Sequence, residues 1–194
     1  MSKRIAFLSA AAFGALALTA AVVAPVSAQD KMMKSEMSGE KTVMVGGAAM
    51  FPSRNIIQNA VNSKDHTTLV AAVKAAGLVE TLEGKGPFTV FAPTNAAFGK
   101  LPAGTVDTLV KPENKATLTK ILTYHVIPGK LEASSLTDGK KLKTVEGEEL
   151  TVKHQDGKVW IVDAKGGTSM VTISNVNQSN GVIHVVDTVL MPAS

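Results

Sequence analysis

The chain contains no cysteine, few aromatic residues and no long run of charge of one sign. Without cysteine it can form no disulfide framework, no thiolate metal site, no cysteine nucleophile and no lipoprotein anchor on an acylated cysteine. The formal net charge is only +4. No dense basic stretch alternates with aromatic residues, as would be expected of a nucleic-acid-binding surface, so we expect no nucleic-acid partner.

Residues 1–28 have the pattern of a secretory signal peptide. Lys3 and Arg4 precede an uncharged, alanine- and leucine-rich run from Ile5 to Ala24, and small residues follow it up to Ala28. We predict cleavage after Ala28 by a Sec-type pathway and a secreted or periplasmic location. The competing interpretation is an uncleaved membrane anchor, because the apolar run is about as long as a bilayer core of ~30 Å requires.

Residues 29–54 are expected to form a methionine-rich lead-in that holds five of the eight methionines. Its first half has too little apolar area to offset the entropy of ordering, which predicts flexibility. Gly46-Gly47 predicts a bend within residues 43–51, which could add an edge to the following domain or dock in its groove. Thioether sulfur is a soft ligand, so Met32, Met33 and Met37 are candidate copper ligands. The alternative role for these side chains is flexible apolar contact.

Helical periodicity dominates the chain from Asn55 onward. Two short amphipathic helices are predicted on either side of residues 65–67, with Asp65 or Thr67 as the N-cap of the second and Gly77 as its end. A strand is predicted at residues 88–92, and Thr94 is expected to cap the short helix that follows it. Further helices are predicted near residues 105–110 and after Pro112.

Beyond Tyr124 the sequence changes to short runs of alternating apolar and polar residues, which are separated by pairs of turn-forming residues. These pairs are Asp138-Gly139, Glu146-Gly147, Asp156-Gly157, Gly166-Gly167 and Asn180-Gly181. They predict a β-meander, with a type I′ hairpin at Asp156-Gly157 because both turn positions need positive φ. Helices followed by strands, without strict βαβ alternation, predict one α+β domain over residues 55–192.

Three stretches of this domain resemble the signatures of the fasciclin family. The first, residues 88–98, reads FTVFAPTNAAF; the second, residues 124–129, reads YHVIPG; the third, residues 180–187, reads NGVIHVVD and is followed by VLMP. Their order and spacing are also similar to the family pattern. Ala96 departs from that pattern, in which an acidic residue often stands after the Thr-Asn pair and favours the helix N-terminus.

The resemblance implies a wedge of mainly antiparallel strands with several short helices packed against it. It also implies a role outside the cytoplasm in adhesion or extracellular protein interaction, without enzymatic activity or cofactor. Integrin-recognition motifs are not evident, so an integrin partner is not inferred. The motif residues that the resemblance singles out are Thr94, Asn95, Tyr124, His125 and His184.

The four histidines are the remaining candidates for catalytic, ligand-binding or metal-binding residues. His125 and His184 lie in apolar, strand-like sequence, and each is expected either to bond the neighbouring backbone as a buried group or to contact a ligand or partner. His184 and Asp187 would face opposite sides of a strand, and no nucleophile elbow, phosphate loop or nucleotide fingerprint occurs. We therefore predict no catalytic residue. His66 and His154 are expected to face solvent, and no two histidines have zinc-type spacing.

The leading hypothesis is an exported module that binds a cell-surface or matrix protein or polysaccharide. Its binding site is expected in the groove between the strands and the helices, with Tyr124 and His125 at the centre. Trp160 is interpreted either as a core anchor or as one wall of a surface contact. The alternative function is periplasmic binding of a small apolar molecule by the domain, or of copper by the methionine segment. No stable membrane span is expected after cleavage.

Overall fold

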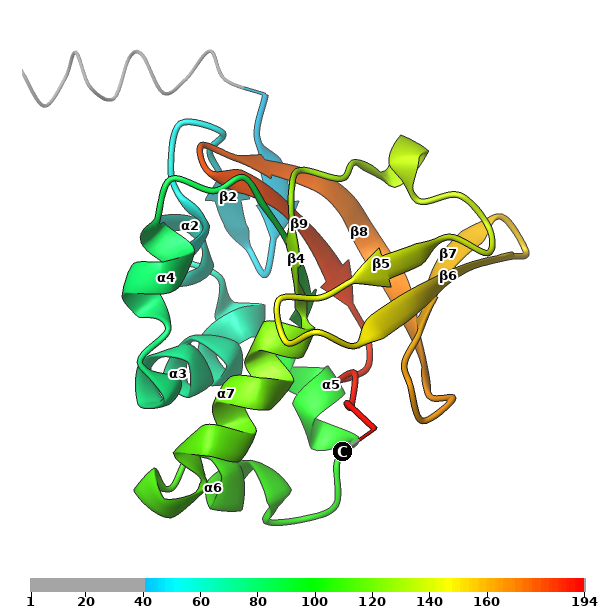
Figure 1. Ribbon diagram of the computed structural model, residues 1–194. Coiled ribbons are helices and arrows are strands. Elements are labelled where there is room, and N and C mark those ends of the chain that lie inside the picture. Colours follow the sequence, from blue (N-terminus) through cyan, green and yellow to red (C-terminus); the bar gives the residue numbers. More distant parts are fainter. Residues whose placement is uncertain (1–40, 194) are drawn as a thin grey trace, which may run out of the picture. The chain divides into compact units, whose positions relative to one another are not determined.

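The computed structural model describes residues 41–193 (Figure 1). The predicted signal peptide of residues 1–28 and the candidate copper ligands Met32, Met33 and Met37 lie outside this range. Within residues 41–193, no helix combines the length and the apolar character needed to cross a membrane.

Seven strands form one sheet in the order β4-β3-β9-β8-β7-β6-β5. They are β3 (Phe88–Pro93), β4 (Val126–Pro128), β5 (Lys141–Lys143), β6 (Glu149–Gln155), β7 (Lys158–Val162), β8 (Thr168–Gln178) and β9 (Gly181–Val186). The run from β5 to β9 is the predicted antiparallel meander, and β3 also pairs antiparallel with β4. The sheet is mixed because β3 and β9 pair in parallel. The α+β class and the mainly antiparallel sheet are confirmed.

The β6–β7 hairpin shows how local chemistry sets the register. Asp156 and Gly157 adopt φ values of 53° and 71°, and Gln155 pairs with Lys158 across the turn. Positive φ at both central residues gives a turn whose twist matches that of the flanking strands. The type I′ prediction for this turn is therefore confirmed.

Helices gather on one side of the β3–β9 pair (Figure 1). They are α2 (Ile56–Ala60), η2 (Lys64–His66), α3 (Thr67–Ala76), α4 (Val79–Glu83), α5 (Asn95–Gly99), α6 (Thr105–Leu109), η3 (Pro112–Asn114) and α7 (Lys115–Tyr124), while the short turn η4 (Ala133–Ser135) follows β4. Gly77 ends α3 in the left-handed conformation at φ 73°, as predicted.

The predicted N-cap of α3 was wrong. Neither Asp65 nor Thr67 occupies the cap position, because the turn η2 runs directly into the helix, and no side chain next to that position caps it. Instead the Thr68 N–H donates to Oδ1 of Asn95, at 3.0 Å. The free donor at the start of α3 is thus satisfied by a residue of α5, which is distant in sequence.

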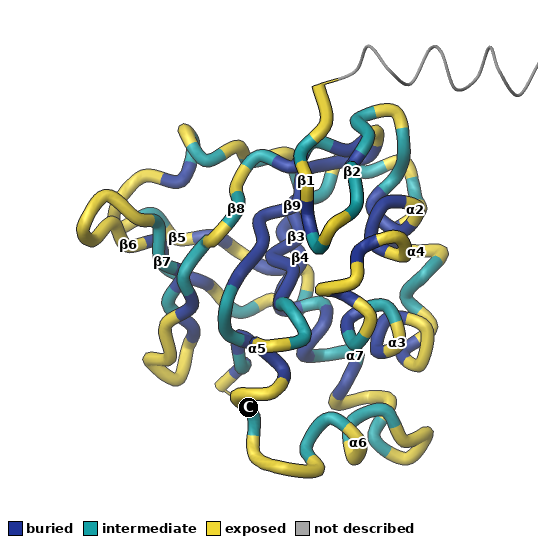
Figure 2. Tube along the Cα trace, turned by 180° about the vertical axis from the view of Figure 1, so that it is seen from behind, coloured by how far each residue is buried: buried dark blue, intermediate teal, exposed yellow. Residues whose placement is uncertain are grey.

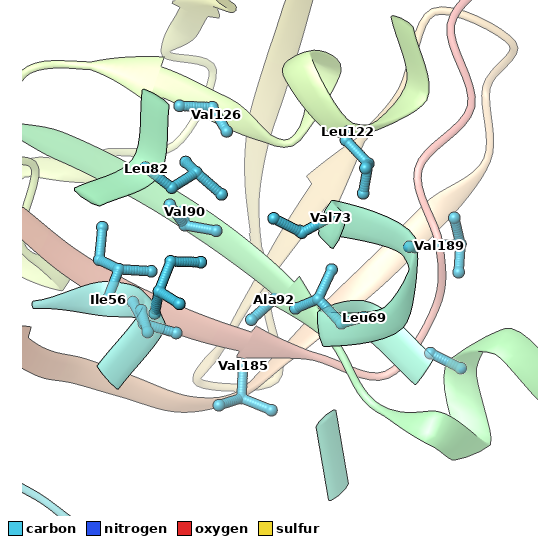
Figure 3. Packing of buried hydrophobic residues seen from close by; sticks show 14 of the residues in the cluster. Ile56, Leu69, Val73, Leu82, Val90, Ala92, Leu122, Val126, Val185 and Val189 are labelled. Carbon is cyan, nitrogen blue, oxygen red and sulfur yellow. The ribbon is translucent and has the colours of Figure 1, made fainter. Parts of the chain in front are cut away.

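Two apolar clusters lie on opposite faces of the central strands. Val90 and Ala92 of β3 and Val185 of β9 belong to the cluster beneath the helices, whereas Phe91 and Val186 belong to the cluster enclosed by the meander. Alternate residues of a strand point to opposite faces, so a strand covered on both faces is apolar throughout. Figure 2 shows β3 and β9 as buried segments within the domain, and Figure 3 shows side chains of the first cluster.

A separate hairpin of β1 (Val43–Val45) and β2 (Ala48–Met50) precedes the helices. The predicted bend at Gly46-Gly47 forms its turn, and Val45 and Met50 are buried in the cluster beneath the helices. The sequence placed the start of the domain at Asn55. The packed domain extends to the N-terminal side of that boundary, because the hairpin supplies core side chains to it.

Candidate functional site

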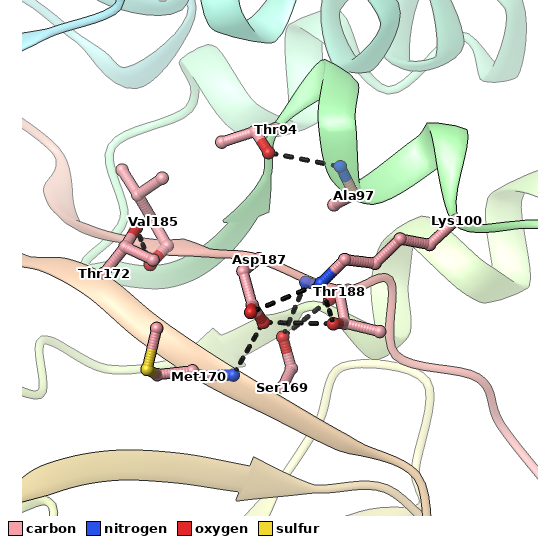
Figure 4. Close-up of polar contacts among 9 residues, drawn as sticks. All are labelled: Thr94, Ala97, Lys100, Ser169, Met170, Thr172, Val185, Asp187 and Thr188. Atoms are coloured by element: carbon pink, nitrogen blue, oxygen red, sulfur yellow. Dashed lines mark hydrogen bonds and ion pairs between the residues drawn. The ribbon is translucent and has the colours of Figure 1, made fainter.

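Thr94 and Asn95 join two helices to each other. The Thr94 hydroxyl accepts a hydrogen bond from the Ala97 N–H at 3.2 Å and caps α5, as predicted (Figure 4). Asn95 accepts from Thr68 at the start of α3, and its amide nitrogen donates to the Lys64 carbonyl at 2.8 Å. Both polar groups of the Asn95 side chain are therefore used to hold α5 against the entry to α3.

Tyr124 is the last residue of α7 and is fully buried, with 0% exposure. Its hydroxyl accepts a hydrogen bond from the Ala164 N–H at 2.9 Å, which ties the end of α7 to the β7–β8 connection. Burial raises the pKa of Tyr124 to about 12. The side chain is thus a neutral internal anchor that solvent does not reach.

His125 does not lie in a strand, contrary to the sequence interpretation, but follows α7 directly as its C-cap. Its Nδ1 lies 2.8 Å from the Ile121 carbonyl, and its Nε2 lies 3.0 Å from the Leu190 N–H. A carbonyl requires a donor and an N–H requires an acceptor, so Nδ1 carries the proton and the imidazole is neutral. Burial lowers the pKa of His125 to about 4, although the Ile121 carbonyl opposes the shift.

His184 lies on β9 and is fully buried, with its ring stacked on Phe91 at 5.7 Å between centroids. Its Nε2 lies 2.8 Å from the Leu131 carbonyl, and its Nδ1 accepts from the Asn175 N–H at 3.4 Å. Burial also lowers the pKa of His184. Like His125, this histidine uses both ring nitrogens to bond backbone.

Asp163 holds two separate backbone segments, and the sequence analysis did not single it out. Its carboxylate accepts hydrogen bonds from the backbone N–H groups of Lys165, Gly167 and Met191, at 3.0, 2.7 and 3.0 Å. With the bond from Leu190 to His125, two consecutive residues of the C-terminal segment are held by side chains. An aspartate followed by Ala-Lys-Gly-Gly is a signal for an Asx-type turn, but the bond to Met191 could not be inferred locally.

Asp187 contacts other groups than His184 does (Figure 4). It accepts from the Met170 N–H at 2.9 Å and forms an ion pair with Lys100 at 3.3 Å. Burial would raise the pKa of Asp187, but the hydrogen bonds from Met170, Thr188 and Lys100 outweigh it and lower the pKa. His184 and Asp187 thus bond different groups and do not form the paired base and orienting carboxylate of a catalytic triad.

The predicted motif residues therefore do not converge on an exposed centre. Tyr124, His125 and His184 are buried, and the hypothesis that the first two contact a partner directly does not fit their 0% and 2% exposure. His66, expected to face solvent, is also buried, at 3% exposure. Among residues 41–193, no three His, Asp or Glu side chains form a group that could hold a metal ion.

Trp160 is half-buried on the outer face of the meander. Its neighbour Ile161 belongs to the inner cluster, so strand alternation turns the Trp160 side chain outward. Lys153 of β6 and Met170 of β8 are its cross-strand partners. Trp160, Lys153 and Met170 therefore lie side by side on this outer surface, which we call the Trp160 face, although the indole Nε1 itself is buried.

A cavity of about 40 Å³ lies beneath the helices, where the sequence analysis placed a groove. Its lining is apolar except for the side chains of His66 and His125. Figure 3 shows Leu82, Val90 and Val73 among the side chains around this interior region. Of the lining residues, Val70 on α3 and Leu78 before α4 are half-buried and the others are buried.

Comparison with known proteins identifies the family. The fasciclin domain model matches residues 64–192. Protein sll1483 of Synechocystis sp. is 51% identical over 153 residues, which cover 79% of this chain and 82% of that protein. Immunogenic protein MPB70 of Mycobacterium bovis is 36% identical, and the match covers 99% of this chain and 98% of that protein. The chain belongs to the fasciclin family.

Two further comparisons concern proteins of which this chain spans a smaller part. Cell surface glycolipoprotein MPB83 of Mycobacterium bovis is 39% identical, and the match covers 76% of this chain and 64% of that protein. A FAS1 domain pair from the insect cell adhesion molecule fasciclin I has a TM-score of 0.65 at 17% identity, covering 78% of this chain and 58% of the other. The second likeness concerns the fold alone.

Proposed function

We propose that this chain is an exported, non-enzymatic interaction module that binds a cell-surface or matrix protein or polysaccharide. The observation that carries the proposal is membership of the fasciclin family, in which one relative is named as a cell surface glycolipoprotein. The adhesion role of fasciclin I supports the same class of function by analogy of fold. The commitment of Tyr124, His125 and His184 to backbone hydrogen bonds is consistent with a scaffold rather than a reaction centre.

We propose the Trp160 face as the contact surface, in place of the buried Tyr124-His125 pair. Tryptophan is enriched at binding hot spots because it offers a large apolar area with few rotatable bonds. Lys153 beside it adds an exposed positive charge, which suits an acidic protein or an acidic polysaccharide. The half-buried indole is already packed on one side, so little of its conformational entropy remains to be lost on binding.

Binding to intact cells of the source organism tests this proposal. Crosslinking and pull-down would use the exported protein, a Trp160→Ala variant and a Val145→Ala variant. Val145 is the matched control, since it is also an apolar residue, is 46% exposed and lies outside the Trp160 face. We expect capture to fall about ten-fold or more for Trp160→Ala and to stay unchanged for Val145→Ala. Equal capture by all three proteins would rule out the Trp160 face.

The methionine segment gives the copper hypothesis its own test. The alternative proposal is that the methionine segment binds Cu(I) through Met32, Met33 and Met37, because thioether ligands select this ion. Cu(I) would be titrated against the exported protein and against a truncated chain beginning at Thr42. Saturable binding that is lost on truncation would support the hypothesis, and equal binding by both chains would contradict it.

A further inference from the structure

Four lysines lie on the outer face of the meander, on the strands β5, β6 and β7 (Figure 1). They are Lys141 and Lys143 on β5, Lys153 on β6 and Lys158 on β7. Their chain neighbours Leu142, Val152 and Val159 pack in the inner cluster, so strand alternation turns the four lysines outward. All four are exposed, and they share this face with Trp160. We call this set the lysine row.

The strand register places these lysines at similar intervals. Lys141 and Lys143 are two residues apart on one strand, which separates them by about 7 Å. Lys153 is the diagonal neighbour of Lys141 across β5 and β6, and Lys158 is the diagonal neighbour of Lys153 across β6 and β7. Diagonal neighbours in antiparallel strands are about 7–8 Å apart. The lysines therefore form a line roughly 20 Å long rather than a compact cluster.

Little negative charge compensates the lysine row. Apart from Lys141, its members form no ion pair with any of residues 41–193. Glu149 lies on the same face and pairs with Lys141 at 3.3 Å, and both of these side chains are more than half exposed. Asp156 lies in the turn beyond the end of the row. Because exposed ion pairs contribute little free energy, an acidic partner can displace Glu149 from Lys141.

Protection of a sheet edge accounts for only part of the lysine row. Lysine on an edge strand discourages pairing with other chains, and β5 is the last strand in the sheet order. That reason applies to Lys141 and Lys143. Lys153 and Lys158 lie on β6 and β7, which have strand partners on both sides. Their positive charges are therefore not needed to protect an edge.

The side chains around the lysine row favour a polysaccharide partner over a folded protein. Cores of protein–protein interfaces are depleted of lysine, and their aromatic anchors insert into pockets of the partner. On this face the lysines are exposed, whereas Trp160, Val162 and Met170 are half-buried. A linear polymer that carries carboxylates along its length matches a straight line of positive charge. Its sugar rings can lie against the partly covered apolar side chains.

We propose that the lysine row binds a linear acidic polysaccharide, whose carboxylates pair with the lysine ammonium groups. This inference rests on the proposed function, because the row shares Lys153 with the Trp160 face. It narrows the partner of that face from a cell-surface or matrix protein or polysaccharide to a polysaccharide with repeated negative charge.

Binding to immobilised polygalacturonate, measured by biolayer interferometry with the exported protein, tests the proposal. A highly methyl-esterified form of the same polymer should bind at least about ten-fold more weakly, because esterification removes the charge and keeps the sugar chain. Added salt should also weaken binding to polygalacturonate, since it screens exposed charges. Absence of binding to polygalacturonate would overturn the proposal. So would tighter binding to poly-L-glutamate, which would assign the row to an acidic polypeptide.

Two quadruple variants of equal net charge separate the lysine row from general charge attraction. The row variant carries Lys141→Gln, Lys143→Gln, Lys153→Gln and Lys158→Gln. The control variant carries Lys74→Gln, Lys85→Gln, Lys111→Gln and Lys115→Gln, at exposed positions outside the meander. With circular dichroism spectra unchanged, the row variant should bind polygalacturonate at least about ten-fold more weakly, and the control variant should bind it as the parent does. Equal weakening of the two variants would contradict a specific site at the row.

The polysaccharide result is independent of the pull-down with Trp160→Ala. If polygalacturonate does not bind but Trp160→Ala still lowers capture by cells, the contact surface is supported and the acidic polysaccharide is wrong. If the row variant alone loses polygalacturonate binding but Trp160→Ala is captured normally, the lysine row is supported and the contact through Trp160 is wrong.

Discussion

At the scale of single residues, His125 contributes to stability by satisfying two distant backbone groups at once. Its replacement by alanine would leave the Leu190 N–H unpaired in the interior and open a cavity beside Ile121. We expect His125→Ala to lower the free energy of unfolding by about 3 kcal/mol. Urea denaturation of this variant beside His154→Ala, a change at an exposed histidine, measures the difference. If His125→Ala lowers the free energy of unfolding no more than His154→Ala does, the stabilising role of His125 is refuted.

Asn180 provides a second test at this scale. Its side-chain oxygen accepts from the Ile56 N–H at 3.1 Å, and its nitrogen donates to the carbonyls of Leu82 and Gly84 at 2.6 and 3.0 Å. Removing these buried bonds by Asn180→Ala should cost about 3 kcal/mol. Asn62→Ala, which removes one bond at an exposed site, should cost less than about 1 kcal/mol. Similar midpoints of thermal unfolding for the two variants would argue against this account.

At the scale of elements, the β1–β2 hairpin is positioned by a close approach to the start of η2. A Cβ atom on Gly46 would lie 2.4 Å from the Ser63 hydroxyl oxygen and 2.7 Å from the Asp65 nitrogen. The Lys64 N–H also donates to the Gly46 carbonyl, at 3.2 Å. The hairpin turn therefore has no space for a side chain on this side.

Gly46 and Gly47 form a matched pair for testing that contact. Both have positive φ, at 56° and 76°, but a Cβ on Gly47 would meet nothing within 4 Å. Alanine at either position incurs backbone strain of about 1 kcal/mol, and only Gly46→Ala adds the steric clash. We expect Gly46→Ala to destabilise the protein by at least about 1 kcal/mol more than Gly47→Ala. Equal unfolding free energies would show that the hairpin does not depend on this approach.

At the scale of the whole molecule, the buried histidines make stability depend on pH. The pKa of His125 is about 4 in the folded protein, and those of His66 and His184 are also lowered. The unfolded chain, with ordinary values near 6.5, binds more protons than the folded chain between about pH 4 and 6.5. The contribution of these neutral histidines to the free energy of unfolding is therefore fully present above about pH 6.5, and it is lost as the pH drops toward 4.

His125 alone accounts for about 3 kcal/mol of this loss, because its pKa is about 4 in the folded protein and near 6.5 in the unfolded chain. Urea denaturation at intervals from pH 7.5 to 4 measures the slope. In His125→Gln the slope should be smaller, because one of the titrating groups is gone. A parent protein whose stability is constant over this range would contradict the neutral, buried state of these imidazoles.

Much of the fold was predictable because it depends on short-range chemistry. The turn at Asp156-Gly157 and the cap at Thr94 each involve residues no more than a few positions apart, and both were predicted correctly. The N-cap of α3 was mispredicted because its acceptor, Asn95, is 27 residues from Thr68. For the candidate site, the sequence identified the motif histidines but could not decide between a buried and an exposed role.

The sequence by itself determined most of the element types, the meander and the resemblance to the family, because the hydrophobic period, the turn residues and the motifs each depend on residues that are close together in the chain. Only the tertiary structure decided that His125 bonds Leu190, 65 residues away, and that His66 is buried. Burial and hydrogen-bond pairing are properties of the assembled core, where the energy of a polar group depends on neighbours that chain folding brings together. The same imidazole would be an exposed contact on one fold and an internal support on another.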